Sequence, residues 1–129
     1  MTNKSANKRD KVDKLIDQFW KHGFLTLSRK YGKYLPEPKP IGQYDIDALG
    51  KYKRKLAIGI TVTEEDLSNN NLVTKINFIA KGYPRLNNFL LTIFVGVPSE
   101  LFLKTSMYLY QLENDVQSKI KLISIPSGK

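Results

Sequence analysis

The chain contains no cysteine and only one histidine among its 129 residues. Without cysteine there is no disulfide, no thiol nucleophile and no cysteine-ligated zinc site. A single histidine argues against a histidine-based metal cage and against a Ser-His-Asp triad. The chemistry that remains open is that of carboxylates and lysines, or no chemistry at all.

Long apolar runs are also missing. No stretch reaches the ~18 apolar residues of a membrane-spanning helix, and the opening MTNKSANKRD lacks the apolar run of a secretory signal. The apolar content of 41% is ordinary for a folded protein, and the length suits one domain. We therefore expect a cytoplasmic protein without a membrane partner, with a flexible basic arm over residues 1–9 and a single domain over residues 10–129.

Positive charge is concentrated in the first part of the chain. The net charge is +9, and residues 1–55 hold 14 lysine or arginine residues against 6 acids, whereas residues 56–129 hold 7 against 6. A basic face most often serves a polyanion, because neutralising phosphates releases counterions. Nucleic acid, DNA before RNA, is therefore the expected partner, and a merely solubilising surface is the alternative.

Hydrophobic periodicity predicts elements in the order α-β-β-β-α-β-α-β. Helices are expected over residues 10–22, 72–81 and 98–112, and strands over residues 24–28, 43–49, 56–62, 89–97 and 118–125. The strands 43–49 and 56–62 flank a short basic turn, which predicts an antiparallel hairpin. The fold class is therefore α/β, with a mixed sheet flanked by helices.

Local signals refine this outline. Thr63 and Asp66 have the spacing of a capping box at a helix start. Phe19 and Trp20 are expected in the core, and His22 at a helix end. The third helix is expected to turn an apolar stripe inward, with surplus apolar area available for a homodimer interface. That stripe comprises Leu101, Phe102, Thr105, Tyr108, Leu109 and Leu112.

Two acids, Asp45 and Asp47, alternate on the predicted strand 43–49 and so share one face. An unpaired carboxylate on an inner strand costs several kcal/mol of desolvation, so its presence needs a reason. One reason is a divalent metal such as Mg²⁺, which prefers carboxylate oxygens and activates water beside a phosphate. The other is an ion pair with lysine or arginine at the edge of the sheet, and the spacing leaves both open.

Cations and aromatic side chains interleave in the basic turn and again in the loop after the first strand. Such segments can contact phosphates and stack on bases, although a solvated loop is the alternative. The candidate nucleic-acid-binding residues are Lys51, Tyr52, Lys53, Arg54, Lys55, Arg29, Lys30 and Lys14.

The segments DKLIDQFWKHGF, LTLS and YDIDALG resemble the PD-(D/E)XK, or restriction-endonuclease-like, nuclease superfamily, and within it the archaeal Holliday-junction-resolvase branch. The resemblance covers residues 10–80. It implies a basic helix before a β-hairpin, Mg²⁺-dependent hydrolysis of a phosphodiester, and a nuclease-like domain over residues 10–129. On this match Asp47 is the metal-binding and catalytic acid, and Asp45 and Asp13 are further catalytic candidates.

The sequence departs from that family on the second hairpin strand, where an acid, any residue and then a lysine are expected. Gly59, Ile60 and Thr61 stand there instead. Losing these charged groups costs orders of magnitude in rate. Either the site is degenerate and the protein binds nucleic acid or another protein, or the missing groups have migrated. The migration candidates are Glu64, Glu65 or Asp66 for the acid and Lys75 or Lys55 for the lysine.

Overall fold

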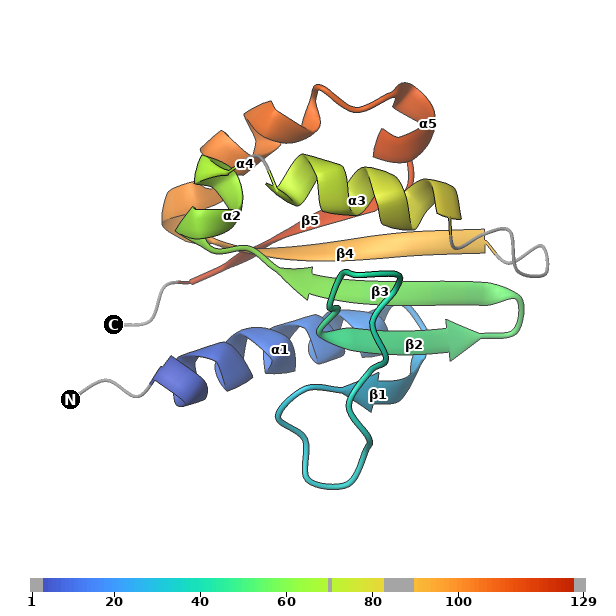
Figure 1. The fold of residues 1–129 in the computed structure, drawn as a ribbon. Helices are drawn as coiled ribbons and strands as arrows, with labels where there is room; N and C mark the ends of the chain where they lie inside the picture. The colour runs from blue at the N-terminus through green and yellow to red at the C-terminus, as the bar shows by residue number, and fades with distance from the viewer. Residues whose placement is uncertain (1–3, 70, 83–89, 127–129) are drawn as a thin grey trace.

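The computed structural model describes residues 4–69, 71–82 and 90–126. Its five strands form one open sheet in the order β1-β2-β3-β4-β5 (Figure 1). The pairs β1–β2 and β2–β3 are antiparallel, whereas the pairs β3–β4 and β4–β5 are parallel. The strands are β1 Leu25–Arg29, β2 Ala48–Tyr52, β3 Lys55–Thr61, β4 Leu90–Pro98 and β5 Ile120–Ile125. An α/β fold with a mixed sheet and flanking helices is therefore confirmed.

The helices divide between the two faces of this sheet. The helix α1 packs on one face, and the other helices cover the opposite face (Figure 1). They are α1 Lys4–Lys21, α2 Glu64–Ser68, α3 Asn71–Gly82, α4 Phe102–Leu109 and α5 Asn114–Gln117, with a short 3-10 turn at Ser99–Leu101. In the described ranges no helix is long and apolar enough to cross a membrane.

An aromatic cluster ties α1 to the centre of the sheet. The ring centroid of Phe94 on β4 lies 5.2 Å from that of Phe19 and 6.0 Å from that of Phe24. The sheet beneath α1 is built from small residues, among them Ala48 and Ala57, which are fully buried. These small residues let the helix approach closely, so the bulky Phe19 fills the space between the two layers.

Several sequence predictions are confirmed in detail. The hairpin of β2 and β3 is antiparallel, with Tyr52 paired to Lys55 across the turn. The capping box is present: the Asp66 amide donates to Thr63 Oγ1, and the Thr63 amide donates to Asp66 Oδ2 at 2.9 Å. His22 follows the end of α1, where its ring nitrogen Nδ1 lies 2.8 Å from the Gln18 carbonyl oxygen.

Element boundaries differ from the predictions at several places. The first helix begins at Lys4, so residues 4–9, which were expected to belong to the arm, are helical. The capping box predicted a helix start at α2 but not its end at Ser68, and the short helix α5 was not predicted. Pro84, which the sequence suggests as a stop after the helix over residues 72–81, lies outside the described ranges.

The strand predicted over residues 43–49 is wrong in its position. The chain forms a closed turn in which Ile41 and Tyr44 exchange backbone hydrogen bonds at 2.8 and 3.0 Å, and β2 begins only at Ala48. The Tyr44 ring packs against Phe78 of α3, which holds this turn over the sheet. Asp45 and Asp47 therefore precede the strand instead of alternating along it.

The prediction that Trp20 belongs to the core is also wrong, because 65% of this residue is exposed while Phe19 is fully buried. The buried stripe of α1 consists of Val12, Leu15 and Phe19, and the next position round the helix faces solvent. On α4 the inward residues include Thr105 and Leu109, as predicted. The opposite side of that helix exposes Leu103, Met107 and Tyr110.

Candidate functional site

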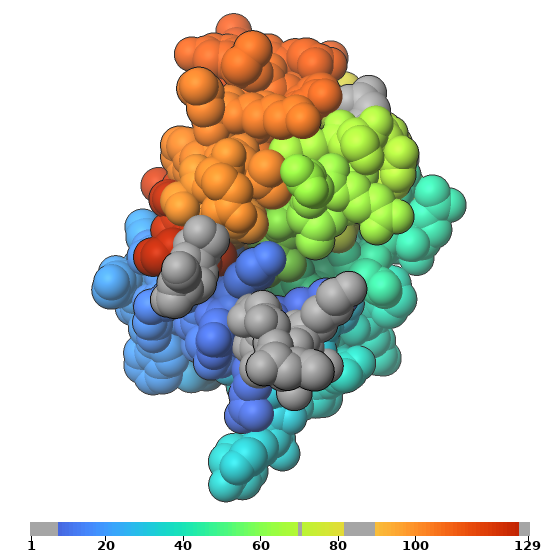
Figure 2. All heavy atoms as spheres, turned by 90° about the vertical axis from the view of Figure 1, so that its left-hand side faces the viewer, coloured from blue at the N-terminus to red at the C-terminus, as the bar shows by residue number. Residues whose placement is uncertain are grey.

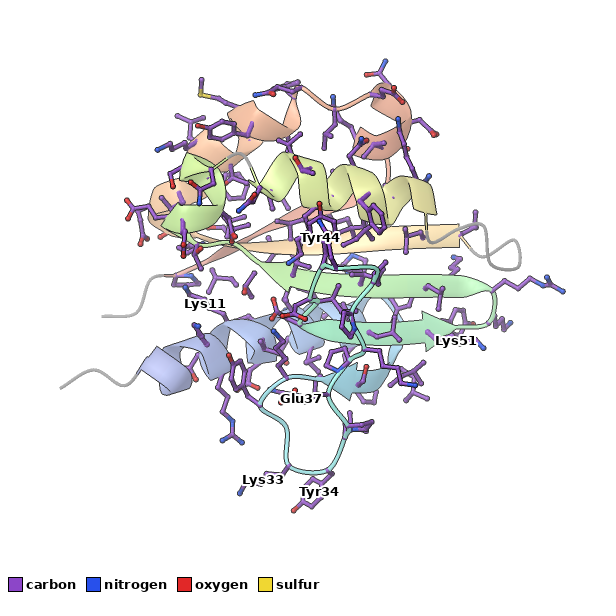
Figure 3. The ribbon with its side chains drawn as sticks, viewed as in Figure 1. Lys11, Lys33, Tyr34, Glu37, Tyr44 and Lys51 are labelled. Carbon is purple, nitrogen blue, oxygen red and sulfur yellow. The ribbon has the colours of Figure 1, made fainter. Side chains whose placement is uncertain are left out.

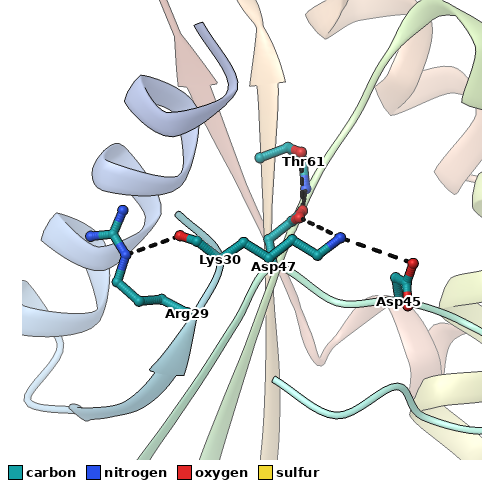
Figure 4. A network of polar contacts seen from close by, with 5 residues as sticks. All are labelled: Arg29, Lys30, Asp45, Asp47 and Thr61. Atoms are coloured by element: carbon teal, nitrogen blue, oxygen red, sulfur yellow. Dashed lines mark hydrogen bonds and ion pairs between the residues drawn. The ribbon is translucent and has the colours of Figure 1, made fainter. Parts of the chain in front are cut away.

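The Asp47 side chain bridges the start of β2 and the end of β3. Its Oδ2 accepts hydrogen bonds from the Thr61 amide at 2.7 Å and from Thr61 Oγ1 at 3.0 Å (Figure 4). The Asp47 amide in turn donates to the Gly59 carbonyl at 2.8 Å. The side chain is only 14% exposed, so these donors replace most of the hydration that the carboxylate would have in solvent.

A lysine from the end of β1 faces the other oxygen of this carboxylate. Lys30 Nζ lies 3.7 Å from Asp47 Oδ1 and 4.0 Å from Asp45 Oδ2. Figure 4 shows the Lys30 side chain extending between the two acids. The Lys30 amide also donates to the Asp47 carbonyl at 2.9 Å, which fixes the two backbones side by side. Asp45 is exposed, so its pairing with Lys30 is the weaker of the two.

Lys75 of α3 belongs to the same neighbourhood. Burial lowers the pKa of Lys75, while the charges of Asp47, Asp66 and Asp45 oppose that shift and the charge of Lys30 adds to it. We call Lys30, Asp45, Asp47, Thr61 and Lys75 the Asp47 cluster. One of the groups named as migration candidates, Lys75, thus lies within electrostatic range of Asp47, whereas Asp66 is engaged with Thr63 in the capping box.

The other migration candidate for the lysine is far from this cluster. Lys55 begins β3 and Thr61 ends it. At ~3.3 Å per residue, the two positions are separated by roughly 20 Å of extended chain. Lys55 therefore cannot act on Asp47 in this fold.

The position at which the resemblance expects the second acid is Gly59, and the packing of α1 leaves little room for a larger side chain there. Gly59 pairs with Ala48 and faces α1. A Cβ atom there would lie 3.1 Å from Leu15 Cδ1 and 3.3 Å from Phe19 Cζ. A carboxylate at this position would be pressed among apolar atoms of α1, where burial without a partner is costly.

Asp13 is engaged elsewhere. Its Oδ1 accepts a hydrogen bond from Arg29 Nη2 at 2.6 Å, which links α1 to β1. In the part of the chain that the structure describes, no three histidine, cysteine, aspartate or glutamate side chains group closely enough to hold a metal ion. Mg²⁺ binding at Asp47, with help from Asp45 and Asp13, therefore stays a prediction.

The basic turn lies at the opposite end of the hairpin from Asp47. Residues 51–55 are all exposed, and Figure 3 shows Lys51 at the far end of β2. From Ala48 to Tyr52 the strand covers roughly 13 Å at the usual rise per residue. The turn and the acid, which the sequence placed in one functional element, are two separate features of the surface.

The remaining nucleic-acid candidates fall into two groups. Lys14 is exposed on α1, whereas Arg29 and Lys30 face the carboxylates described above. The loop after β1 projects from the body of the protein (Figure 2). It carries Lys33 and Tyr34 near its tip, and Tyr34 is 94% exposed (Figure 3).

No family model matches this chain, and no curated protein or solved structure shows significant similarity to it. The geometry of the Asp47 cluster and the distribution of cations therefore carry the functional argument. The sequence did not reveal Thr61 as the partner of Asp47, because that contact depends on the register of β2 against β3.

Proposed function

We propose that this chain is a nucleic-acid-binding protein with a restriction-endonuclease-like fold, impaired in Mg²⁺-dependent phosphodiester hydrolysis. The observation that carries the proposal is the contact between Asp47 and Thr61. The acid stands where the resemblance expects the metal-binding residue, and a threonine that donates to it stands where the lysine is expected. A neutral hydroxyl cannot supply the positive charge that such a lysine provides.

The arrangement of elements supports the fold part of this proposal. A helix precedes three antiparallel strands, and further helices lead into a parallel strand. Asp47 directly precedes the second strand and lies beside the end of the third. The resemblance implies a metal-binding acid on the first strand of this hairpin, next to where Asp47 stands.

The distribution of charge supports the binding part. The excess cations belong to residues 1–55, which form α1, β1, the projecting loop, β2 and the turn that follows it (Figure 3). These elements lie together on one half of the molecule (Figure 1), while residues 56–129, which include α4 and α5, hold only 7 lysine or arginine residues against 6 acids and are nearly neutral. A polyanion would therefore be attracted to one side of the protein.

Two assays on the full chain test this proposal. Fluorescence anisotropy with labelled duplex DNA and a four-way junction should show binding that weakens steeply between about 50 and 200 mM salt, because phosphates are being neutralised. Incubation of the same DNA with Mg²⁺ or Mn²⁺ should give no cutting beyond that of Asp47→Ala. RNA of matched sequence should bind less tightly than DNA. Absence of salt-sensitive binding would overturn the proposal.

A second candidate is an active endonuclease or junction resolvase with migrated groups. The position of Lys75 near Asp47 favours it, because this residue can supply a cation beside the acid. This candidate predicts metal-dependent cutting that is lost in both Asp47→Ala and Lys75→Met. Lys81→Met is the matched control, since Lys81 lies on the same helix but pairs with Glu113 at the surface.

A non-catalytic protein-interaction subunit, or a homodimer, is the candidate from another class. The exposed stripe of Leu103, Met107 and Tyr110 on α4 favours it. It predicts that Lys53→Glu combined with Arg54→Glu leaves nucleic-acid affinity unchanged. The nucleic-acid proposal predicts a large loss of affinity in that double variant, with a smaller salt dependence.

A further inference from the structure

The most exposed large ring on α1 belongs to Trp20, in the last turn of that helix. It is 65% exposed, and it is the chain's single tryptophan. The buried side of α1 is filled by Phe19, so Trp20 contributes little to the core. A ring of this size in solvent is available for contact with another flat apolar surface.

A second exposed ring lies on the same side of the sheet. Gly50 of β2 faces α1, because a Cβ atom there would lie 2.9 Å from Phe19 Cδ2. Side chains alternate along a strand, so Tyr52 points to the same face two residues further on. Tyr52 is 45% exposed. Trp20 and Tyr52 therefore both belong to the α1 side of the sheet, at the end where α1 stops and β2 turns into β3.

Cations adjoin both rings in the sequence. The turn carries Lys51, Lys53, Arg54 and Lys55, and no acid occurs between Asp47 and Glu64. Lys53 Nζ lies 5.4 Å from the centroid of the Tyr52 ring, so one cation directly accompanies an aromatic side chain. Lys21 follows Trp20 and is also exposed. We call this surface, formed by Trp20, Lys21 and residues 51–55, the hairpin-end patch.

We propose that the hairpin-end patch binds single-stranded nucleic acid, with unpaired bases stacked on Trp20 and Tyr52 and phosphates held by the cations of the turn. This inference rests on the proposed function and adds the form of nucleic acid recognised. In a duplex the bases already stack on one another, so exposed rings gain a partner only where bases are unpaired. The patch lies at the far end of β2 from Asp47, so it is distinct from the Asp47 cluster.

An anionic membrane is the rival partner for a surface of tryptophan and lysine. A helix that lies on a membrane presents a continuous apolar face to the lipid. The apolar face of α1 is instead buried in the protein through Val12, Leu15 and Phe19. The burial of the apolar face of α1 therefore favours nucleic acid over a membrane surface.

The single tryptophan gives a direct measurement of this contact. Titration of the full-length protein with oligo(dT) should strongly quench Trp20 fluorescence, because a base stacks on the indole ring. A duplex of the same length should bind through its phosphates with little quenching. Binding of oligo(dT) without quenching, or equal quenching by duplex, would overturn the inference. A blue shift with vesicles of phosphatidylserine and phosphatidylcholine, without any response to oligo(dT), would identify a membrane site instead.

Variants separate stacking from charge. Trp20→Ala should weaken oligo(dT) binding roughly tenfold, as loss of one stacked base does, and leave duplex affinity nearly unchanged; Trp20→Phe should restore most of the loss. Tyr110→Ala is the matched control, since Tyr110 is 78% exposed but lies on α4 in the nearly neutral half. An unchanged oligo(dT) affinity in Trp20→Ala contradicts the inference alone. Failure of every nucleic acid to bind contradicts the proposed function as well.

Discussion

The amide and the hydroxyl of Thr61 donate to the same oxygen of Asp47, at 2.7 and 3.0 Å. One residue at the end of β3 therefore fixes the acid that precedes β2. The second carboxylate oxygen faces Lys30 at 3.7 Å. Asp47 is thus held by a residue of the hairpin that follows it. Its Oδ2 is occupied by Thr61, and only its Oδ1 is left to face a cation.

Thr61→Val tests how much this contact contributes to stability. The valine keeps the shape and the amide donor but removes the hydroxyl, so the largely buried carboxylate loses one of its hydrogen bonds. We expect the free energy of unfolding to fall by about 1–2 kcal/mol in urea titrations. Thr61→Ser keeps a hydroxyl and should lose less. Equal stability of the valine variant and the parent protein would show that the hydroxyl contact contributes nothing.

Gly59→Glu tests whether the family's second acid can be restored. The new side chain would meet Leu15 and Phe19, so the carboxylate would be buried without a partner. We expect a loss of more than about 3 kcal/mol in the free energy of unfolding, and no gain of nuclease activity. Gly59→Ala adds the crowding without the charge and should lose much less. Lys55→Glu places the same acid at the exposed start of β3 and should change stability by less than about 0.5 kcal/mol.

Lys53→Gly tests the conformation of the turn. Lys53 has a φ of +54°, in the left-handed region where glycine is favoured. We expect the free energy of unfolding of the glycine variant to be about 0.5–1 kcal/mol higher than that of the parent protein, because the strain is relieved. We also expect the variant to bind nucleic acid more weakly, because a cation is lost. Lys55→Gly removes a cation from β3 instead, and should lower both stability and affinity. A Lys53→Gly variant that is less stable than the parent protein would contradict the strain argument.

Lys75 predicts a particular pH dependence of stability. Because burial lowers the pKa of Lys75 in the folded state, the unfolded chain binds more protons between that lowered pKa and the ordinary value of 10.5. The free energy of unfolding of the protein therefore rises with pH in that window, as far as this group determines it. Lys75→Met should be more stable than the parent protein near neutral pH, and the difference should shrink as the pH approaches 10.5. Lys81→Met should show no such trend in unfolding titrations.

The sequence predicted the framework of the fold because the relevant signals are local. Periodicity located α1 and the inner strands, and the spacing of Thr63 and Asp66 located a helix start. The separation of Asp47 from the basic turn could also have been predicted from the sequence, since six positions from Asp47 to Lys53 imply roughly 20 Å of extended chain.

Other features depend on partners that are distant in sequence. The exposure of Trp20 follows from which side of α1 packs on the sheet, and that side carries Val12, Leu15 and Phe19. The start of β2 was misplaced because Tyr44 is held by Phe78 of α3. The contact of Asp47 with Thr61 follows from the register between two strands. None of these partners is indicated by local composition or spacing.

The ring of Phe19 lies 5.2 Å from that of Phe94, so the first helix and the fourth strand share one interior. The uneven charge of the chain therefore does not mark two independent folding units. A fragment cut after β3 would leave Phe19 and Leu15 without the β4 side of their core. A polyanion bound only to the basic half would raise the melting temperature of the whole domain, α4 and β5 included, because binding to the native state is linked to cooperative unfolding.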